Sequence, residues 1–305
     1  MDKYNQQNLF ISAAILIALT TLLWVGSHTS WIGLALAAVV FSFIGLTNYA
    51  LIHEACHHNL NSKTIPNWLT GAVLGWFFPV SFTFMETVHQ VHHLNNRTDS
   101  EMFDYYYPDD NLLIKYGQWY SILIGIYPPI IPIGSILLAL TPSFFNLHPW
   151  KAAKSSSIIF DRNLFTKQVL NKIRLEVFSG VLFWLFLFML LDLQILPVLI
   201  IYTTFWINWS TRQYVTHAFS PRDVIQGAWN LKVSKLMGWI FLNSQWDKVH
   251  HQHPRAAWQE LPQLGANSQK PISYWKQYFS LWRGPRPNTE PAPTALDRIP
   301  HQGAR

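Results

Sequence analysis

The sequence has few charged residues and a single cysteine. Only 12% of its 305 residues are Asp, Glu, Lys or Arg, about half the usual share in a soluble domain. The one cysteine, Cys56, excludes an intramolecular disulfide and any cysteine-rich zinc or iron–sulfur site, and it is compatible with a reduced compartment. Because 50% of the residues are hydrophobic, lipid is the expected solvent for much of the chain.

The positive charge lacks a pattern that would indicate nucleic acid. The formal net charge is +6, but the basic residues are dispersed among apolar segments and form no Arg/Lys-rich stripe. We therefore expect no nucleic-acid partner. Attraction of the basic residues to anionic lipid on the cytoplasmic side of a membrane is the simpler explanation.

Four long segments predict membrane-spanning helices in two hairpins. Residues 9–25 and 31–52 carry no charge, and each is close to the roughly 20 residues that cross a hydrocarbon core. Residues 177–191 and 196–209 are similar and predict a second hairpin. The expected fold class is an all-α integral membrane protein with about four transmembrane helices.

The remaining apolar segments are not expected to be simple spans. Residues 66–84 predict a re-entrant or interfacial segment, and residues 116–150 contain prolines that interrupt a helix. An excess of Lys and Arg in residues 151–176 places that stretch in the cytoplasm. We expect one membrane domain over residues 1–282 and a disordered, Pro-rich tail over residues 283–305.

Clustered histidines are the strongest chemical signal. In HEACHH, His53 and His57 are four residues apart and share one helix face, with His58 next to them. In the motif HQVHH, the histidines at positions i, i+3 and i+4 likewise share one helix face. The clustered histidines are His53, His57 and His58, then His89, His92 and His93, and later His217, His250 and His251.

Such clusters indicate a metal site. Isolated histidines such as His28, His148 and His301 are ordinarily surface or core residues. Neighbouring imidazoles that can protonate repel one another unless a cation keeps them neutral. Imidazole binds zinc, copper, iron and nickel, so the ligand type alone does not select the metal.

Two other classes of protein share part of this pattern. HEACH contains the HExxH motif of zinc proteases, in which two histidines bind zinc and a glutamate, here Glu54, is the base. A protease site uses three protein ligands, whereas at least eight histidines are present, which favours two ions. A metal transporter would place its ligands at mid-depth in the membrane, whereas these clusters lie at the ends of spans.

The histidine motifs resemble the three histidine boxes of the membrane fatty acid desaturase and hydroxylase superfamily. The resemblance covers about residues 30–265, with the first box at His53–His58 and the second at His89–His93. In the third box, DKVHH, Asp247 occupies the position of the usual His or Gln. By this resemblance, His217 completes the ligand set, while Asp247, Asn243 and Glu54 are possible ligands or partners of ligands.

The resemblance implies a centre of two irons per chain, with dioxygen as co-substrate and no catalytic residue apart from the metal ligands. It places this centre in a helical cap on the cytoplasmic face of a four-helix stalk. Electrons would come from a separate ferredoxin, rubredoxin or cytochrome b5 type of protein. The charged residues after the second box, Arg97, Asp99, Glu101 and Asp104, are expected to form mainly surface ion pairs.

Desaturation of a fatty acid or acyl lipid is the leading prediction for the reaction. The alternatives within the superfamily are fatty acid hydroxylation, decarboxylation to a terminal alkene, and hydroxylation or ketolation of a carotenoid. The metal ligands do not separate these outcomes, because the outcome depends on where the substrate carbon lies.

Overall fold

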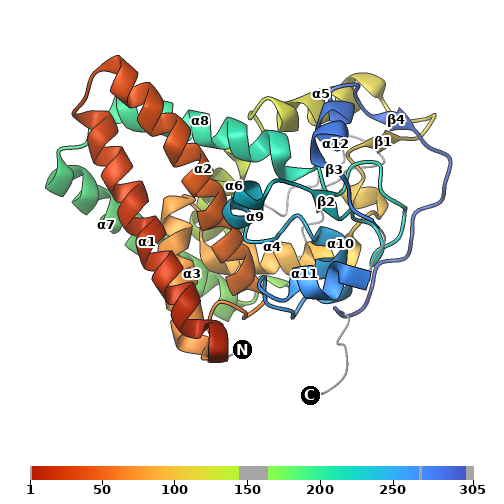
Figure 1. Ribbon diagram of the computed structural model, residues 1–305, viewed down its shortest axis with the longest axis horizontal. Helices are drawn as coiled ribbons and strands as arrows, with labels where there is room; N and C mark the ends of the chain where they lie inside the picture. The colour runs from red at the N-terminus through yellow and green to blue at the C-terminus, as the bar shows by residue number, and fades with distance from the viewer. Residues whose placement is uncertain (1, 144–163, 268–269, 300–305) are drawn as a thin grey trace. The chain divides into compact units, whose positions relative to one another are not determined.

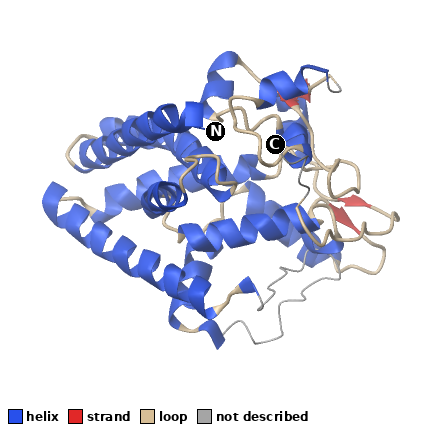
Figure 2. Ribbon diagram, turned by 90° about the horizontal axis from the view of Figure 1, so that it is seen from below, coloured by secondary structure: helices blue, strands red, loops and turns tan. Residues whose placement is uncertain are grey.

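The computed structural model describes residues 2–143, 164–267 and 270–299, and these residues are mostly helical (Figure 1). Two short pairs of strands are the only described sheets (Figure 2). The longer helices are α1 (Asp2–Ser27), α2 (Trp31–Cys56), α3 (Thr64–Phe77), α4 (Phe82–Asn95), α5 (Leu112–Leu123), α6 (Ile130–Leu140), α7 (Lys167–Leu191) and α8 (Ile195–Gln213). The shorter elements are η1 (Asp99–Glu101), β1 (Tyr105–Tyr106), β2 (Leu231–Lys232), α9 (Lys235–Ile240), α10 (Asp247–Gln252), α11 (Leu261–Leu264), η4 (Gly265–Asn267), β3 (Ile272–Ser273), α12 (Tyr274–Leu281) and β4 (Arg286–Pro287). The all-α prediction is confirmed.

The chain forms two compact units, each built from segments that are discontinuous in sequence. Unit 1 comprises Met1–Thr87, Pro128–Phe144 and Arg162–Trp209. Unit 2 comprises Val88–Tyr127, Phe145–Asp161 and Ser210–Arg305. The single membrane domain expected over residues 1–282 stays a prediction, and we describe each unit by itself.

Unit 1 contains the helices that can cross a membrane. Three described helices are long and apolar enough: Lys3–Ser27, Trp31–Cys56 and Lys167–Leu191. Helices α3 and α4 together are apolar enough for a fourth crossing but meet at 97°, as in a broken span or a re-entrant loop. This bend agrees with the interpretation of residues 66–84. Helix α8, which contains the predicted span 196–209, is not among the candidates, since polar residues from Asn208 onward lower its hydropathy.

Aromatic rings form the centre of unit 1. Phe41 of α2 lies edge-on to Tyr202 and Phe205 of α8, with ring centroids 5.2 and 6.1 Å apart. Phe78 contacts Phe205 and Trp209 in the same edge-on manner. Edge-to-face packing suits aromatic rings because their positive edges meet negative faces. These rings fix α2 and the first part of α8 against the turn after α3.

A buried carboxylate joins α7 to the bend between α3 and α4. Glu176 is 2% exposed and accepts hydrogen bonds from Trp68 Nε1 (2.6 Å), Ser81 Oγ (2.5 Å), and Thr83 N (2.9 Å) and Oγ1 (2.5 Å). Four donors offset much of the cost of burying this charge in an apolar unit. The 97° bend is therefore held by a specific interaction.

Unit 2 has its own core and includes all of the described C-terminal segment from Ser210 onward. Trp119 of α5 is fully buried with Tyr214, Leu231 and Leu281, and its Nε1 donates to the Leu281 carbonyl (2.8 Å). The parallel pairs β1–β4 and β2–β3 add short ladders.

Backbone hydrogen bonds connect parts of the C-terminal segment to the rest of unit 2, and the disorder expected of residues 283–305 stays a prediction. Arg286 N donates to Asp104 O, and Leu296 N donates to Leu94 O, each at 2.9 Å. Proline-rich sequence cannot form a core of its own, but its remaining backbone N–H groups can pair with another segment. His301, like His148, lies outside the described residues.

Replacing Glu176 tests the bend in unit 1. We expect Glu176→Gln to lower the free energy of unfolding by at least about 2 kcal/mol, because the amide nitrogen then faces donors in place of an acceptor. Thermal unfolding of the purified chain in detergent measures the effect. The matched control is Asp192→Asn, since Asp192 has a 93% exposed side chain in the same unit. Equal unfolding temperatures for both variants would show that the carboxylate is not needed.

Candidate metal centre

Three elements of unit 2 supply the histidines of the second and third motifs. The end of α4 carries His89, His92 and His93 on one face, as the i, i+3, i+4 spacing predicts. Helix α10 carries His250 and His251, and His217 lies in the turn that follows α8. The structure brings these six histidines together in two groups of three.

The first histidine group consists of His89, His93 and His250. Nε2 of His93 lies 3.1 Å from Nε2 of His89 and 3.0 Å from Nε2 of His250. An ion about 2.1 Å from each nitrogen holds two ligands roughly 3.0 Å apart when they subtend about 90°. The spacing therefore fits imidazoles that share one metal ion.

The second histidine group consists of His92, His217 and His251. Each offers a ring nitrogen, and these three atoms lie within 4.8 Å of one another. The ring centroids of His92 are 4.8 Å from His217 and 5.2 Å from His251. His217 and His251 are buried, so few water molecules can separate the rings.

Hydrogen bonds at Nδ1 orient two rings of the second group. Nδ1 of His92 lies 3.3 Å from Glu101 Oε2, and Nδ1 of His217 lies 3.2 Å from the Gly227 carbonyl oxygen. Both partners are acceptors, so each Nδ1 carries the proton, and a neutral ring then has a lone pair on Nε2. A carboxylate or carbonyl behind the imidazole is the usual support of a metal-binding histidine.

Asp247 adds a carboxylate to the second group. Its Oδ2 lies 3.0 Å from Nε2 of His217, and its Oδ1 lies 4.0 Å from Nε2 of His251. Oδ2 is buried and accepts no hydrogen bond from the described residues. Since Nδ1 of His217 already carries a proton, either a second proton on Nε2 or a metal ion between Nε2 and Oδ2 lets these two atoms lie so close. The donor set therefore fits a metal ion.

The two carboxyl groups of this site remain ionised. Burial raises the pKa of Asp247, but the charge and proximity of His217, followed by His251 and His250, hold it well below its usual value. Burial also raises the pKa of Glu101, but its hydrogen bond to His92 and the charges of His92 and His217 lower it overall. Conversely, burial lowers the pKa of His217, while Asp247 and Gly227 raise it overall. Negative charge therefore surrounds the second group.

The histidines of the first motif lie in unit 1. His53 and His57 are close, with ring centroids 5.1 Å apart, as their i, i+4 spacing predicts. Glu54 is 3% exposed, with Oε1 3.9 Å from Nδ1 of His53. His58 differs from the helical expectation because α2 ends at Cys56 and His58 takes a left-handed φ of 58°. Its side chain is 57% exposed and lies 3.4 Å from Glu86.

Asn243, a weaker candidate ligand, has other contacts. Its Nδ2 donates to the Trp258 carbonyl (3.1 Å), and its Oδ1 lies 3.5 Å from Gln245 Nε2. Asn243 belongs to neither histidine group.

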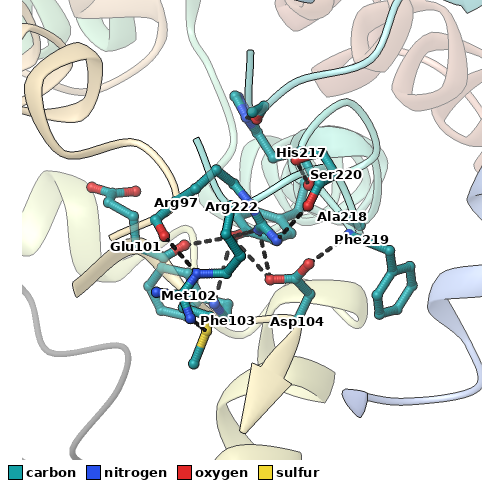
Figure 3. Close-up of polar contacts among 12 residues, drawn as sticks. Arg97, Glu101, Met102, Phe103, Asp104, His217, Ala218, Phe219, Ser220 and Arg222 are labelled. Carbon is teal, nitrogen blue, oxygen red and sulfur yellow. Dashed lines mark hydrogen bonds and ion pairs between the residues drawn. The ribbon is translucent and has the colours of Figure 1, made fainter. Parts of the chain in front are cut away.

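A buried ion pair in unit 2 connects α4 to the segment around His217 (Figure 3). Arg97 and Asp104 are both fully buried and lie 2.8 Å apart. Arg97 also donates to the Ser220 carbonyl (3.1 Å), and Asp104 accepts from Phe219 N (2.5 Å). The expectation of surface ion pairs is therefore wrong for this pair, because tertiary packing covers both side chains.

Arg222 (Figure 3) reinforces the same connection, and so does Tyr214. Arg222 donates to the Arg97 carbonyl (3.0 Å) and to Asp99 (2.9 Å), and the Tyr214 hydroxyl donates to the Glu101 carbonyl (2.5 Å). The sequence offered one signal for this network: an Arg and an Asp close behind a metal-ligand motif in a chain that is poor in charge.

The comparisons with known proteins give one match. The family model described as fatty acid desaturase matches residues 29–282, a range that contains all nine clustered histidines. No curated protein and no solved structure matches the chain. The matched family comprises oxidoreductases that modify membrane lipids.

Removing one histidine tests the second group. We expect His92→Ala to lose bound metal, because His92 is central to the group and is oriented by Glu101. Elemental analysis of the detergent-purified chain measures this loss. His28→Ala is the control, since His28 Nδ1 bonds to the Trp24 carbonyl in unit 1, and it should keep its full metal content. His148→Ala should also do so. Normal metal content in His92→Ala would remove His92 from the ligand set.

A second variant tests the buried ion pair. Arg97→Lys keeps the charge but loses the planar set of donors that reaches Asp104, Tyr214 and Ser220 together. Since breaking a buried pair costs about 3–5 kcal/mol, we expect the unfolding temperature to fall by several degrees. Metal content should fall with it. Arg255→Lys at an exposed site is the control, and equal losses in both variants would contradict the role of Arg97.

Proposed function

Since the chain belongs to the fatty acid desaturase family, we propose that it is a di-iron membrane enzyme that uses dioxygen to oxidise a C–H bond of an aliphatic lipid. The observation that carries this proposal is the pair of histidine groups in unit 2, with the ionised carboxylates of Glu101 and Asp247 beside the second group. Two separate sets of converging imidazoles fit two ions better than one.

The proposed ligands come from all three motifs. The second and third motifs supply both groups of unit 2, together with His217. We propose that His53 and His57 of unit 1 supply further ligands to the same centre, because both are half-buried at the end of a helix. The place of Asp247 beside the Nε2 atoms of His217 and His251 supports a direct ligand role. His58 stays a prediction from the first motif.

The iron centre, when bound, would supply an oxidant derived from dioxygen that can remove hydrogen from an alkyl carbon. The protein's residues hold the imidazoles in one tautomer, through Glu101 and Gly227, and keep them dry. Removal of a second hydrogen yields an alkene, whereas transfer of oxygen yields an alcohol. We propose desaturation of a fatty acyl chain. The family's description supports this choice over hydroxylation, terminal-alkene formation and carotenoid oxidation.

Two further parts of the proposal concern the surroundings of the enzyme. A separate one-electron donor of the ferredoxin, rubredoxin or cytochrome b5 type would supply the electrons that reduce dioxygen. The positive-inside rule supports a cytoplasmic active site, because residues 151–176 carry an excess of Lys and Arg.

A zinc protease is the alternative from another class. Its HExxH base must reach a metal-bound water, but Glu54 is 3% exposed and lies beside Nδ1 of His53. That position suits a carboxylate that orients an imidazole better than one that activates water. The family match also favours oxidation over hydrolysis.

The decisive experiment measures metal content and lipid products together. We expect about two irons per chain by elemental analysis, and a new unsaturated acyl lipid in cells that express the protein. Expression of His92→Ala should remove the product, because the second group then lacks a ligand. His28→Ala is the control and should preserve it. One zinc per chain with an unchanged lipid profile would overturn the proposal, and a hydroxylated or shortened product would redirect it within the family.

A further inference from the structure

The last described residues of unit 2 lie against the segment that follows α4. We call residues 284–299 the C-terminal strap, which runs from β4 toward the C-terminus (Figure 1). Strand β4 of the strap pairs in parallel with β1. Arg286 N donates to Asp104 O at 2.9 Å, and Asn288 N donates to Tyr106 O at the same distance. The strap is thereby joined to one end of this segment.

The strap also contacts the other end of the same segment. Leu296 N donates to Leu94 O at 2.9 Å, in the last turn of α4. The strap therefore bridges residues 94–107, since its contact with Leu94 lies at the start of this range and its contacts with Asp104 and Tyr106 lie near the end. Fixing both ends of a segment limits how far the residues between them can move.

The bridged segment carries a partner of the candidate metal centre. It begins directly after His93 and contains Glu101, whose Oε2 lies 3.3 Å from Nδ1 of His92. Loss of such a partner behind a metal-binding imidazole typically lowers metal affinity by roughly 10- to 100-fold. A restraint on residues 94–107 is therefore also a restraint on the second histidine group.

Backbone hydrogen bonds hold the strap with little help from buried side chains. Of its residues only Gly284 and Pro285 are buried, and a segment with few buried contacts opens at a low cost in free energy. Pro287 lies between the two donors of β4, so its missing N–H removes no bond of the pairing. The four prolines of the strap favour extended backbone, which reduces the entropy lost when it docks. The strap can therefore dock and release while the core of unit 2 stays folded.

We propose that the C-terminal strap is a positioning element of the metal centre. While docked, it restrains residues 94–107 so that Glu101 stays at Nδ1 of His92, and its release weakens metal binding at the second histidine group. The buried pair of Arg97 and Asp104 already joins this segment to the rest of unit 2, so the strap is not required for folding. The inference rests on the metal centre of the proposed function.

Removing two donors of the strap in the full chain tests the proposal. The double variant Asn288→Pro/Leu296→Pro lacks the N–H groups that bond to Tyr106 and Leu94. We expect amide hydrogen exchange in residues 94–107, and loss of bound metal to excess EDTA, each to become at least roughly fivefold faster in detergent. The unfolding temperature should not change. The matched control is Thr294→Pro, at an exposed strap residue whose N–H bonds to no described backbone carbonyl, and it should behave as the unmodified chain.

Rescue by the strap in trans separates positioning from folding. A chain that ends at Pro285 should lose metal as fast as the double variant, and a synthetic peptide of residues 286–299 in excess should slow this loss, whereas a scrambled peptide should not. Unchanged metal loss in the double variant would overturn the proposal, as would equal acceleration in Thr294→Pro.

Two further results separate this proposal from neighbouring ones. An unfolding temperature that falls as far as in Arg97→Lys would overturn it, since the strap would then serve the whole fold. If the purified chain holds zinc and no iron, the proposed function fails, but release of that zinc still tests the strap in the same way.

Discussion

The buried ion pair between Arg97 and Asp104 is the constraint on which the histidine-bearing part of unit 2 depends. Both side chains are fully buried, so each charge relies on the other for the stabilisation that water would otherwise provide. Arg97 follows α4, which carries the second motif, and its donors reach the segment just after His217. Displacing either segment would leave a buried charge without its partner. The ion pair therefore positions His92 and His217, although neither histidine takes part in it.

Unit 1 uses the same principle at another place. In an apolar unit a buried carboxylate is costly, and Glu176 is tolerated because four donors converge on it. Those donors come from both sides of the bend between α3 and α4. Each buried charge in this chain needs its hydrogen-bond or ion-pair partners in one specific arrangement. The few buried charges therefore have a large influence on the geometry of the backbone around them.

Local periodicity explains which parts of the site the sequence predicts. The spacing of His53 and His57, and of His89, His92 and His93, fixes their relative positions as soon as a helix forms. The spacing of residues in the sequence does not predict that Glu101 and Gly227 contact the histidines, or that Arg97 pairs with Asp104. These are tertiary contacts. His58 departed from the pattern because α2 ends two residues before it. Aromatic contacts inside unit 1, such as that between Phe41 and Phe205, are also tertiary and follow from no local spacing.

A carboxylate at position 247 changes the charge of the proposed centre while keeping a ligand atom in place. The usual His or Gln at this position of the third motif is neutral, whereas Asp247 is ionised because nearby imidazoles lower its pKa. Negative charge close to a metal ion stabilises the higher oxidation state and so lowers the reduction potential. Glu101 acts in the same direction through His92, since a carboxylate at Nδ1 makes the imidazole a stronger donor. In the proposed centre, Asp247 would therefore adjust the electronic properties of the metal while it keeps a ligand atom in place.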